Sequence, residues 1–324
     1  MRAYITGATG FVGSNIARVF GAQHGADLCT PVHHVQPDAG FAGSPVVDLT
    51  DPAAVRESVL AFRPDVIVHS AILNDLNRIY ADRQAGWTSY VGATRNVVDA
   101  ANEVGARVIL VSTDWVFDGT QGGADESTPP NPVNFYGVLK VVSELVVLER
   151  AGHGAVARIS GVNGLHWARN EMPIAQNAGF GYFVDSVRKA LSAGSPFTVW
   201  EGPKINMIAT PSLASDSAER MWQIADRGLD GVFHCCGAES NARRDLAHAA
   251  AAAWGLDPSL IRIGPPEGEQ LGGAPIPYDS SLSCTRTAAA VGLPALSVAD
   301  QLARFRAELE AREAEPARQS PMRT

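Results

Sequence analysis

The stretch RAYITGATGFVGSNIARVF, residues 2–20, carries a short apolar run through a glycine-rich turn into a helix-like pattern. Gly7, Gly10 and Gly13 lie in the turn. Glycine lets a chain turn tightly and lets backbone amides approach a pyrophosphate, and a helix N-terminus adds unpaired N–H groups and partial positive charge. The spacing is GxxGxxG rather than GxGxxG, but its place between a strand and a helix predicts a dinucleotide-binding loop.

Strand and helix patterns alternate through the rest of the first half. The strand candidates are short, almost continuous apolar runs, which is typical of a parallel sheet with helices on both faces. Strands are predicted at residues 2–6, 27–32, 65–71, 107–113 and 155–160, and helices at residues 13–25, 51–62, 87–105 and 135–152.

The alternation stops near residue 162, where a long segment rich in Gly and Asn follows. We therefore expect an α/β fold with two lobes. Residues 1–161 would form a doubly wound parallel sheet that binds the dinucleotide, with later segments returning to it. Residues 162–308 would form mainly a smaller C-terminal α/β lobe that binds substrate. The polar end, residues 309–324, is expected to be disordered.

Composition and charge exclude several classes of function. A net charge of -8 over 324 residues argues against general affinity for nucleic acid or anionic membranes, and the sequence has no apolar run long enough to span a bilayer. The four cysteines form no CxxC pair, which predicts reduced thiols in a cytoplasmic protein. The eight histidines show no HxH or HxxxH spacing, so no catalytic metal is expected.

The segment after the second strand bears on the choice of cofactor. NAD sites usually place an acid there, but residues 31–40 read PVHHVQPDAG, with no acid at the strand end. His33 and His34 would suit a 2′-phosphate, which favours NADP(H) over NAD(H); their being ordinary loop residues is an equally open alternative. Asp48 is a candidate for the adenine end, or else a turn residue.

A tyrosine and a lysine stand four residues apart in NFYGVLK, residues 134–140. Tyr136 and Lys140 would share one helix face. A nearby ammonium stabilises phenolate and lowers the tyrosine pKa toward neutrality. Ser112 and Thr113 end a predicted parallel strand, at the sheet edge where ligands bind in doubly wound folds. The pattern YxxxK is weak alone, but after a glycine loop and this strand end it predicts a catalytic pair.

These motifs resemble those of the extended short-chain dehydrogenases/reductases, which are Rossmann-type enzymes, and most closely the dTDP-4-dehydrorhamnose reductase group. The resemblance covers about residues 1–305. The segments that carry it are TGATGFVGSNIA (6–17), VSTDWVFDG (111–119), NPVNFYGVLKVVSE (131–144), ARISGV (157–162) and ATPSLASDSAE (209–219).

The resemblance implies NAD(P)H-dependent reduction of a keto group, foremost the 4-keto group of a nucleotide-linked (dTDP-) 6-deoxysugar. It implies that Tyr136 protonates the carbonyl oxygen, that Thr113 hydrogen-bonds that oxygen with Ser112 as the alternative, and that Lys140 binds the nicotinamide ribose and tunes Tyr136. It also places the following residues at the cofactor: Gly7, Thr9, Gly10, Phe11, Val12, Gly13, His33, His34, Asp48, Leu49, Ala71, Tyr136 and Lys140.

Several further residues are candidates for substrate contact. Arg169 would suit a diphosphate and Trp167 a base or sugar, although packing of Trp167 and solvation of Arg169 are equally open. Departures from the family pattern, such as Tyr90 where asparagine is common, leave the identity of the sugar open. The full set is Asp114, Trp115, Val116, Trp167, Arg169, Asn170 and Trp200.

Two other functions remain open. The same Tyr–Lys pair serves sugar-nucleotide epimerases, which retain NAD, and some relatives are NADP-binding regulatory subunits of another enzyme. A dehydratase is disfavoured because Asp114 and Trp115, rather than Asp-Glu, follow Thr113. We expect a small nucleotide-sugar substrate, no nucleic-acid or membrane partner and, by analogy alone, a homodimer built on paired helices.

Overall fold

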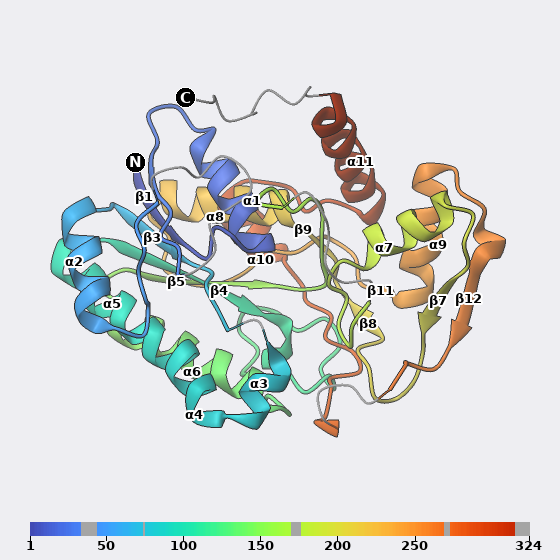
Figure 1. Ribbon diagram of the computed structural model, residues 1–324, viewed down its shortest axis with the longest axis horizontal. Helices are drawn as coiled ribbons and strands as arrows, with labels where there is room; N and C mark the ends of the chain where they lie inside the picture. The colour runs from blue at the N-terminus through green and yellow to red at the C-terminus, as the bar shows by residue number, and fades with distance from the viewer. Residues whose placement is uncertain (34–43, 74, 170–175, 269–272, 315–324) are drawn as a thin grey trace, which may run out of the picture.

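The computed structural model describes residues 1–33, 44–73, 75–169, 176–268 and 273–314 (Figure 1). His34, Asn170 and most of the predicted tail fall outside these described residues. Within them, no helix is long and apolar enough to cross a membrane.

A six-stranded sheet with all strands parallel forms the larger lobe, which confirms the predicted doubly wound α/β class. Its strand order is β10-β5-β4-β3-β1-β2, so the order reverses between β1 and β3, and ligands of such sheets bind beside that point. The strands are β1 (Arg2–Thr6), β2 (Asp27–Cys29), β3 (Val66–His69), β4 (Arg107–Thr113), β5 (Gly154–Ile159) and β10 (Gly231–His234).

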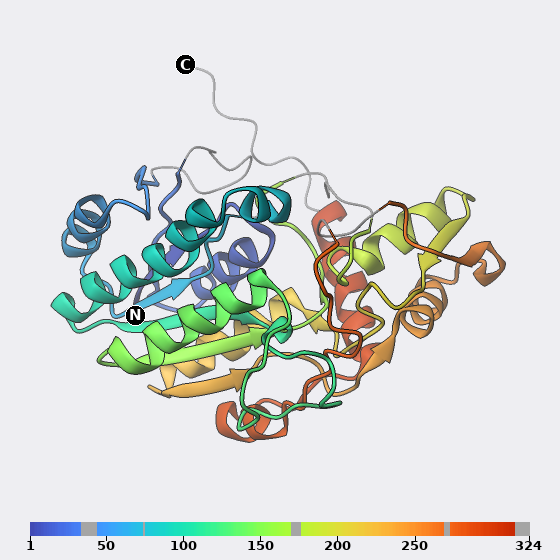
Figure 2. The ribbon, with the colours of Figure 1, turned by 90° about the horizontal axis from the view of Figure 1, so that it is seen from below.

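Helices cover both faces of the sheet because successive strand residues point to opposite sides. Ile5 and Val68 join the apolar core beneath α1 and α8, whereas Tyr4 and Ile67 join the core beneath α2, α5 and α6. Figure 2 shows the latter three helices side by side on one face. Their bounds are α1 (Phe11–Gly21), α2 (Pro52–Phe62), α5 (Ala93–Val104), α6 (Phe135–Arg150) and α8 (Ala214–Asp226).

Short elements connect β3 to α5 and β4 to α6. The first connection runs through two short helices and a π-helical turn, and the second begins with a 3-10 turn directly after Thr113. These elements are α3 (Leu76–Ala81), α4 (Arg83–Trp87), η1 (Thr88–Gly92) and η2 (Asp114–Val116).

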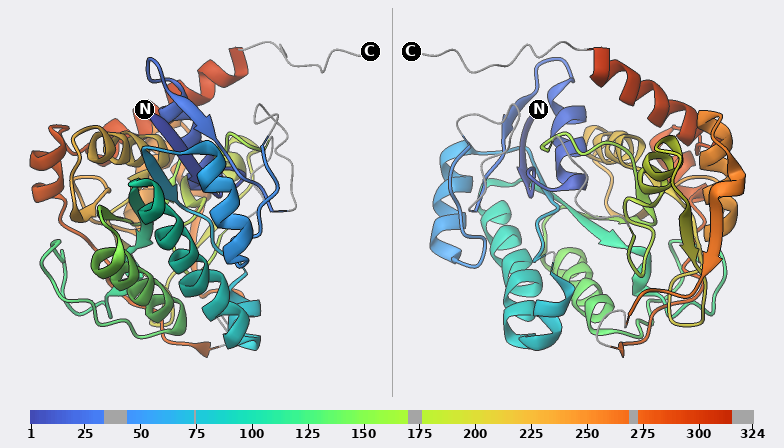
Figure 3. Two further views of the ribbon diagram at one scale, coloured as in Figure 1. Left: turned by 90° about the vertical axis from the view of Figure 1, so that its left-hand side faces the viewer. Right: turned by 45° about the vertical axis from the view of Figure 1, so that its right-hand side comes forward.

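The smaller lobe packs helices around short strand pairs (Figure 3). Its core lies between α7, α9, α11 and the parallel pair β7–β12. The elements are β6 (Val162–Asn163), α7 (Phe183–Ser192), β7 (Phe197–Trp200), β8 (Ile208–Ala209), β9 (Ser212–Leu213), β11 (Asn241–Ala242), α9 (Arg243–Trp254), η3 (Pro258–Leu260), β12 (Ile261–Gly264) and α11 (Val298–Ala314). The remaining helix, α10 (Thr285–Val291), packs against α8 and β10 of the larger lobe.

The start of the expected disordered tail is helical. Residues 309–314 belong to α11, where Leu309 packs on the lobe core and Arg306 pairs with Glu310 one turn away. Arg312 also donates to the backbone carbonyls of His166 and Arg169. These contacts explain why the polar sequence continues as helix beyond residue 308.

Candidate active site

The glycine loop is a tight cradle at the end of β1. A Cβ on Gly13 would stand 2.0 Å from the Gly7 oxygen, and one on Gly7 would stand 2.7 Å from the Ala71 nitrogen. Gly7 also has a φ of +73°, which side-chain-bearing residues rarely adopt. Gly10 is the N-cap of α1 and has no capping side chain. The loop therefore presents backbone at the start of a helix, as the sequence predicted.

The remaining loop residues are held from both lobes. Thr9 lies in the turn, and Val12 packs against the sheet core. The ring of Phe11 stacks on Tyr182 of the smaller lobe at 4.7 Å and lies 6.0 Å from the His166 ring. Phe11 thus joins the cradle to the second lobe.

At the end of β2, His33 and Asp48 contact each other. The His33 Nε2 lies 3.6 Å from the Asp48 Oδ2, and both side chains are about half exposed. Asp48 also accepts from the Thr50 backbone and hydroxyl, as a turn residue does. Asn96 of α5 donates to the carbonyl of Leu49 at 2.9 Å and so fixes this segment.

Thr113, Tyr136 and Lys140 converge at the carboxyl end of β4. Asn134 caps α6 by accepting from the Gly137 amide at 2.8 Å, which sets the start of the helix. One face of the first turns then carries Tyr136, hydrogen-bonded to Thr113, and Lys140, whose Nζ donates to the Val111 carbonyl at 2.9 Å.

The pKa shifts of this pair differ from the sequence prediction. Burial raises the pKa of Tyr136 to about 12; the hydrogen bond with Thr113 opposes this rise and the charge of Asp114 adds to it. Burial lowers the pKa of Lys140 to about 8, and Glu144 opposes that fall. The lowering of the tyrosine pKa that was expected from Lys140 is therefore not found: desolvation of the phenolate dominates, and the opposing contact is Thr113.

Asp114 lies beneath Thr113 rather than open to a ligand. Its buried carboxylate accepts from the hydroxyls of Thr113 at 2.9 Å, Ser160 at 2.7 Å and Ser280 at 2.5 Å, and burial raises its pKa. Thr113 gives its single hydroxyl hydrogen to Asp114, and its oxygen also contacts Tyr136.

The two residues after Asp114 face different surroundings. The Trp115 ring stands edge-on to Tyr136 at 6.0 Å and packs against Ala178 and Ile276. Val116 is fully buried in a separate apolar cluster. Trp115 therefore borders the reacting end of Tyr136, whereas Val116 supports it from behind.

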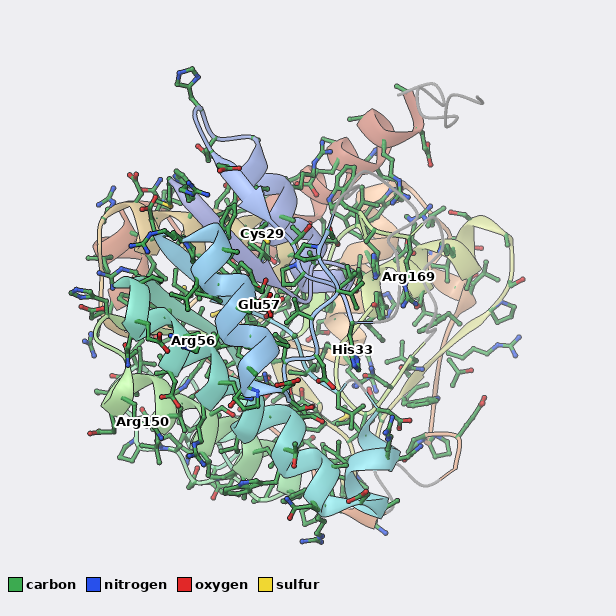
Figure 4. The ribbon with its side chains drawn as sticks, turned by 60° about the vertical axis from the view of Figure 1, so that its left-hand side comes forward. Cys29, His33, Arg56, Glu57, Arg150 and Arg169 are labelled. Carbon is green, nitrogen blue, oxygen red and sulfur yellow. The ribbon has the colours of Figure 1, made fainter. Side chains whose placement is uncertain are left out.

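Trp167 lies against α1 in the structure. The Arg18 guanidinium covers its ring at 3.6 Å, Arg312 lies 5.7 Å from it, and its indole N–H donates to Asn15. These contacts correspond to the packing alternative. Arg169 is exposed, and Figure 4 shows it on the same face of the molecule as His33.

Trp200 is 9% exposed and clusters with Ile205 and Met207. It therefore helps to build the inner wall of the smaller lobe, away from the aromatic cluster around Tyr136.

Sequence reasoning did not assign Arg243 a role in supporting the site. Arg243 is fully buried and donates to the carbonyls of Asn206, Ala178 and Gly179, so it holds the segment that packs on Trp115. The sequence gives no sign of this role, because the partners of Arg243 come from distant chain segments. Ser112, the predicted alternative to Thr113, donates instead to Glu144 at 2.5 Å.

Comparison with known families agrees with this geometry. The sequence model of the RmlD substrate binding domain matches residues 1–311. The chain belongs to this family. The family predicted from the motifs is thereby confirmed, and structures similar to this RmlD-family chain include dTDP-4-dehydrorhamnose reductases and a dTDP-glucose 4,6-dehydratase.

Three relatives illustrate the range of the family. Methionine adenosyltransferase 2 subunit beta of Xenopus tropicalis is 28% identical over 290 residues, 88% of this chain and 81% of that protein. A hypothetical dTDP-4-dehydrorhamnose reductase of Sulfolobus tokodaii is 26% identical with a TM-score of 0.71, covering 89% of this chain and 93% of its own. The Bacillus anthracis dTDP-4-dehydrorhamnose reductase, solved with NADP, is 22% identical with a TM-score of 0.76, covering 95% and 99%; at that identity the likeness shows the fold.

Proposed function

We propose that this RmlD-family protein is an NAD(P)H-dependent reductase of a nucleotide-linked sugar, with the 4-keto group of a dTDP-linked 6-deoxysugar as the leading substrate and NADP(H) as the preferred cofactor. The observation that carries the proposal is the convergence of Tyr136, Thr113 and Lys140 at the edge of the sheet where the glycine cradle also lies. The NADP-bound structural relative supports the cofactor class.

The cradle fits a dinucleotide. Side chains at Gly7 or Gly13 would collide with the backbone, and Gly10 leaves the α1 N-terminus without a side-chain cap. Gly7, Gly10 and Gly13 would hold the pyrophosphate, Ala71 would line the same edge, and Lys140 would hold the nicotinamide ribose. Bound there, the reduced nicotinamide supplies the hydride.

The chain itself supplies the proton. In the resting site the phenol of Tyr136 keeps its hydrogen and lies beside Thr113, whose own hydroxyl hydrogen is held by Asp114. A substrate carbonyl oxygen near Tyr136 would take over that phenol hydrogen and receive the proton during reduction. Thr113 can then turn its hydroxyl from Asp114 to the phenolate, which is a stronger acceptor because it is charged. Trp115 excludes water beside this oxygen.

The direct test is NADPH oxidation with dTDP-4-keto-6-deoxyhexoses, in the wild type beside Tyr136→Phe. We expect turnover in the wild type and a loss of about 10²- to 10⁴-fold in the variant, with NADPH affinity nearly unchanged. Equal rates in both proteins would sink the assignment of Tyr136 as the acid. An NAD that stays bound through purification would instead favour an epimerase.

A second candidate, a regulatory subunit of another enzyme, is favoured by the 28% identity to methionine adenosyltransferase 2 subunit beta over 88% of this chain. Its test is chromatography of this protein mixed with a methionine adenosyltransferase catalytic subunit. Co-elution, together with no NADPH oxidation by any ketone tried, would establish this function in place of the reductase. A cytoplasmic location suits either role, since all four cysteines are free thiols.

A further inference from the structure

We propose that Glu144 is a positioning residue that keeps Lys140 protonated, and that the two-pronged ion pair with Arg158 fixes the Glu144 carboxylate for this purpose. This inference rests on the proposed reductase function, in which Lys140 acts as a cation toward the cofactor ribose. It assigns a role to a carboxylate that does not touch the reacting atoms.

The helix geometry places the three side chains in one row. Tyr136, Lys140 and Glu144 follow each other at intervals of four residues on α6, so they lie on one face, one turn apart. Lys140 is 5% exposed and Glu144 is 2% exposed. The row therefore runs from the proposed reacting end of the site into the space between α6 and the sheet.

The carboxylate of Glu144 is held by the two strands under α6. Its Oε1 accepts from the Ser112 hydroxyl of β4 at 2.5 Å and from the Arg158 Nε of β5 at 3.0 Å. Its Oε2 accepts from the Arg158 Nη2 at 2.7 Å. This two-pronged pairing fixes the position of the carboxylate as well as its charge.

Glu144 therefore acts on two buried cations, Lys140 on its own helix and Arg158 on β5. A guanidinium group is always protonated in proteins, whereas a buried lysine loses its proton readily. If the carboxylate were neutral, the two cations would repel each other in a medium that screens poorly. Lys140 is the partner that would respond by losing its proton.

The other titratable groups near Lys140 do not replace this carboxylate. His69 of β3 is neutral, because burial and the charge of Lys140 lower its pKa to about 3. Tyr90 of η1, whose ring lies 5.6 Å from the Lys140 Nζ, has a pKa raised by burial and is neutral too. Tyr136 on α6 has its pKa raised to about 12.

Behind Arg158, His234 of β10 contacts the guanidinium at 3.4 Å. Burial lowers the pKa of His234 to about 4, so its ring is neutral at ordinary pH. The net charge around Tyr136, Lys140 and Glu144 is thus set by the Glu144 carboxylate, which lies between the cations Lys140 and Arg158. Burial lowers the pKa of Lys140 to about 8 even with Glu144 present, so a modest further loss of support would deprotonate it near neutral pH.

The experiment measures NADPH affinity by fluorescence, and turnover where a ketone substrate is in hand, from about pH 6 to about pH 10. For Glu144→Gln, we expect the pH above which NADPH affinity and turnover fall to move at least about one unit toward acid. We call the fall of NADPH affinity and turnover at high pH the alkaline limb. The double variant E144Q/R158M also loses the second cation, so we expect its alkaline limb to return to near the wild-type pH. Ser112→Ala, the matched control, removes one hydrogen bond without changing charge and should leave the limb in place.

An unchanged limb in a folded Glu144→Gln variant would overturn the inference. If Glu144→Gln does not fold, the double variant E144Q/R158M is tested instead. In this charge-balanced protein, an alkaline limb displaced toward acid would also overturn the inference. The NADPH-binding arm needs no substrate. Failure to turn over any ketone would therefore count against the proposed reductase, while a shifted binding limb would still establish the role of Glu144.

Discussion

Tyr136 and Lys140 lie one turn apart on α6, yet their surroundings act on their protons in opposite directions. Tyr136 faces the Thr113 hydroxyl and the Asp114 carboxylate, and burial raises its pKa to about 12. Lys140 faces Glu144, which only partly offsets the burial that lowers its pKa to about 8. The site thus holds the phenol proton more firmly, and the ammonium proton more weakly, than water would.

The largest effect expected from this contrast is on stability at alkaline pH. Between about pH 8 and pH 10.5 the unfolded chain keeps the Lys140 proton that the folded chain has released, so the free energy of unfolding rises with pH. Above pH 10 the folded chain keeps the Tyr136 proton that the unfolded chain loses, so Tyr136 makes the free energy of unfolding fall as pH rises toward 12.

Urea titrations of Lys140→Met and Tyr136→Phe across this range check both signs. In the wild type, Lys140 should make the free energy of unfolding rise with pH by at most about 3 kcal/mol, and Lys140→Met should not show this rise. Tyr136 should make the free energy of unfolding fall by at most about 3 kcal/mol, and Tyr136→Phe should not show this fall. Other buried tyrosines titrate in the same range, so the difference between each variant and the wild type is the quantity to read. Parallel curves for both variants would show that the two groups are not perturbed as described.

A smaller effect is expected from Asp114→Asn, which disturbs the tyrosine end alone. The amide can donate to the Thr113 oxygen, which turns the Thr113 hydroxyl hydrogen away from residue 114 and changes the contact between Thr113 and Tyr136. We expect turnover to fall by about tenfold, equivalent to about 1.4 kcal/mol of transition-state stabilisation.

The pH above which NADPH affinity and turnover fall distinguishes this variant from Glu144→Gln. For Asp114→Asn this pH should stay the same, because the charge beside Lys140 is unchanged. Ser280→Ala, which removes one donor and keeps the carboxylate, is the matched control and should change the rate less. If this pH shifted in Asp114→Asn, the surroundings of Tyr136 and of Lys140 would not be independent of each other.

The same contrast explains which parts of the site could be read from sequence. The glycine loop and the pair Tyr136–Lys140 are local patterns, set by a few neighbouring residues on one turn or one helix. Glu144 also follows from such spacing, since it stands one turn beyond Lys140, and counting one turn further would have found it. The fold class was equally accessible, because continuous apolar strands alternate with helices through the first half.

Contacts between distant segments could not be read in this way. Ser280 reaches Asp114 across 166 residues of chain, and Arg243 reaches Ala178 across 65. Trp167 and Trp115 look alike in sequence as aromatic candidates, but only Trp115 borders Tyr136, because Trp167 is held by Arg18. The helix through residue 314 likewise depends on tertiary contacts that composition does not reveal.

The smallest effect on catalysis is expected on the opposite face of α6. Leu145 is 51% exposed, and Val138 and Leu148 on the same side are 38% and 37% exposed, whereas the inward face carries the polar row. Their spacing of seven and then three residues forms an apolar stripe that suits a second helix. If the homodimer expected by analogy forms, this stripe is the face of α6 that we expect to pack against α6 of a second copy.

Leu145→Glu places a charge on that stripe and should convert a dimer to monomers in analytical ultracentrifugation, because two like charges would meet across a two-fold axis. Turnover per chain should change by less than about twofold, since Leu145 points away from Lys140 and Tyr136. Leu145→Met keeps the apolar area and serves as the control that should stay dimeric. A wild-type protein that sediments as a monomer at all concentrations would remove this face from consideration as a self-contact.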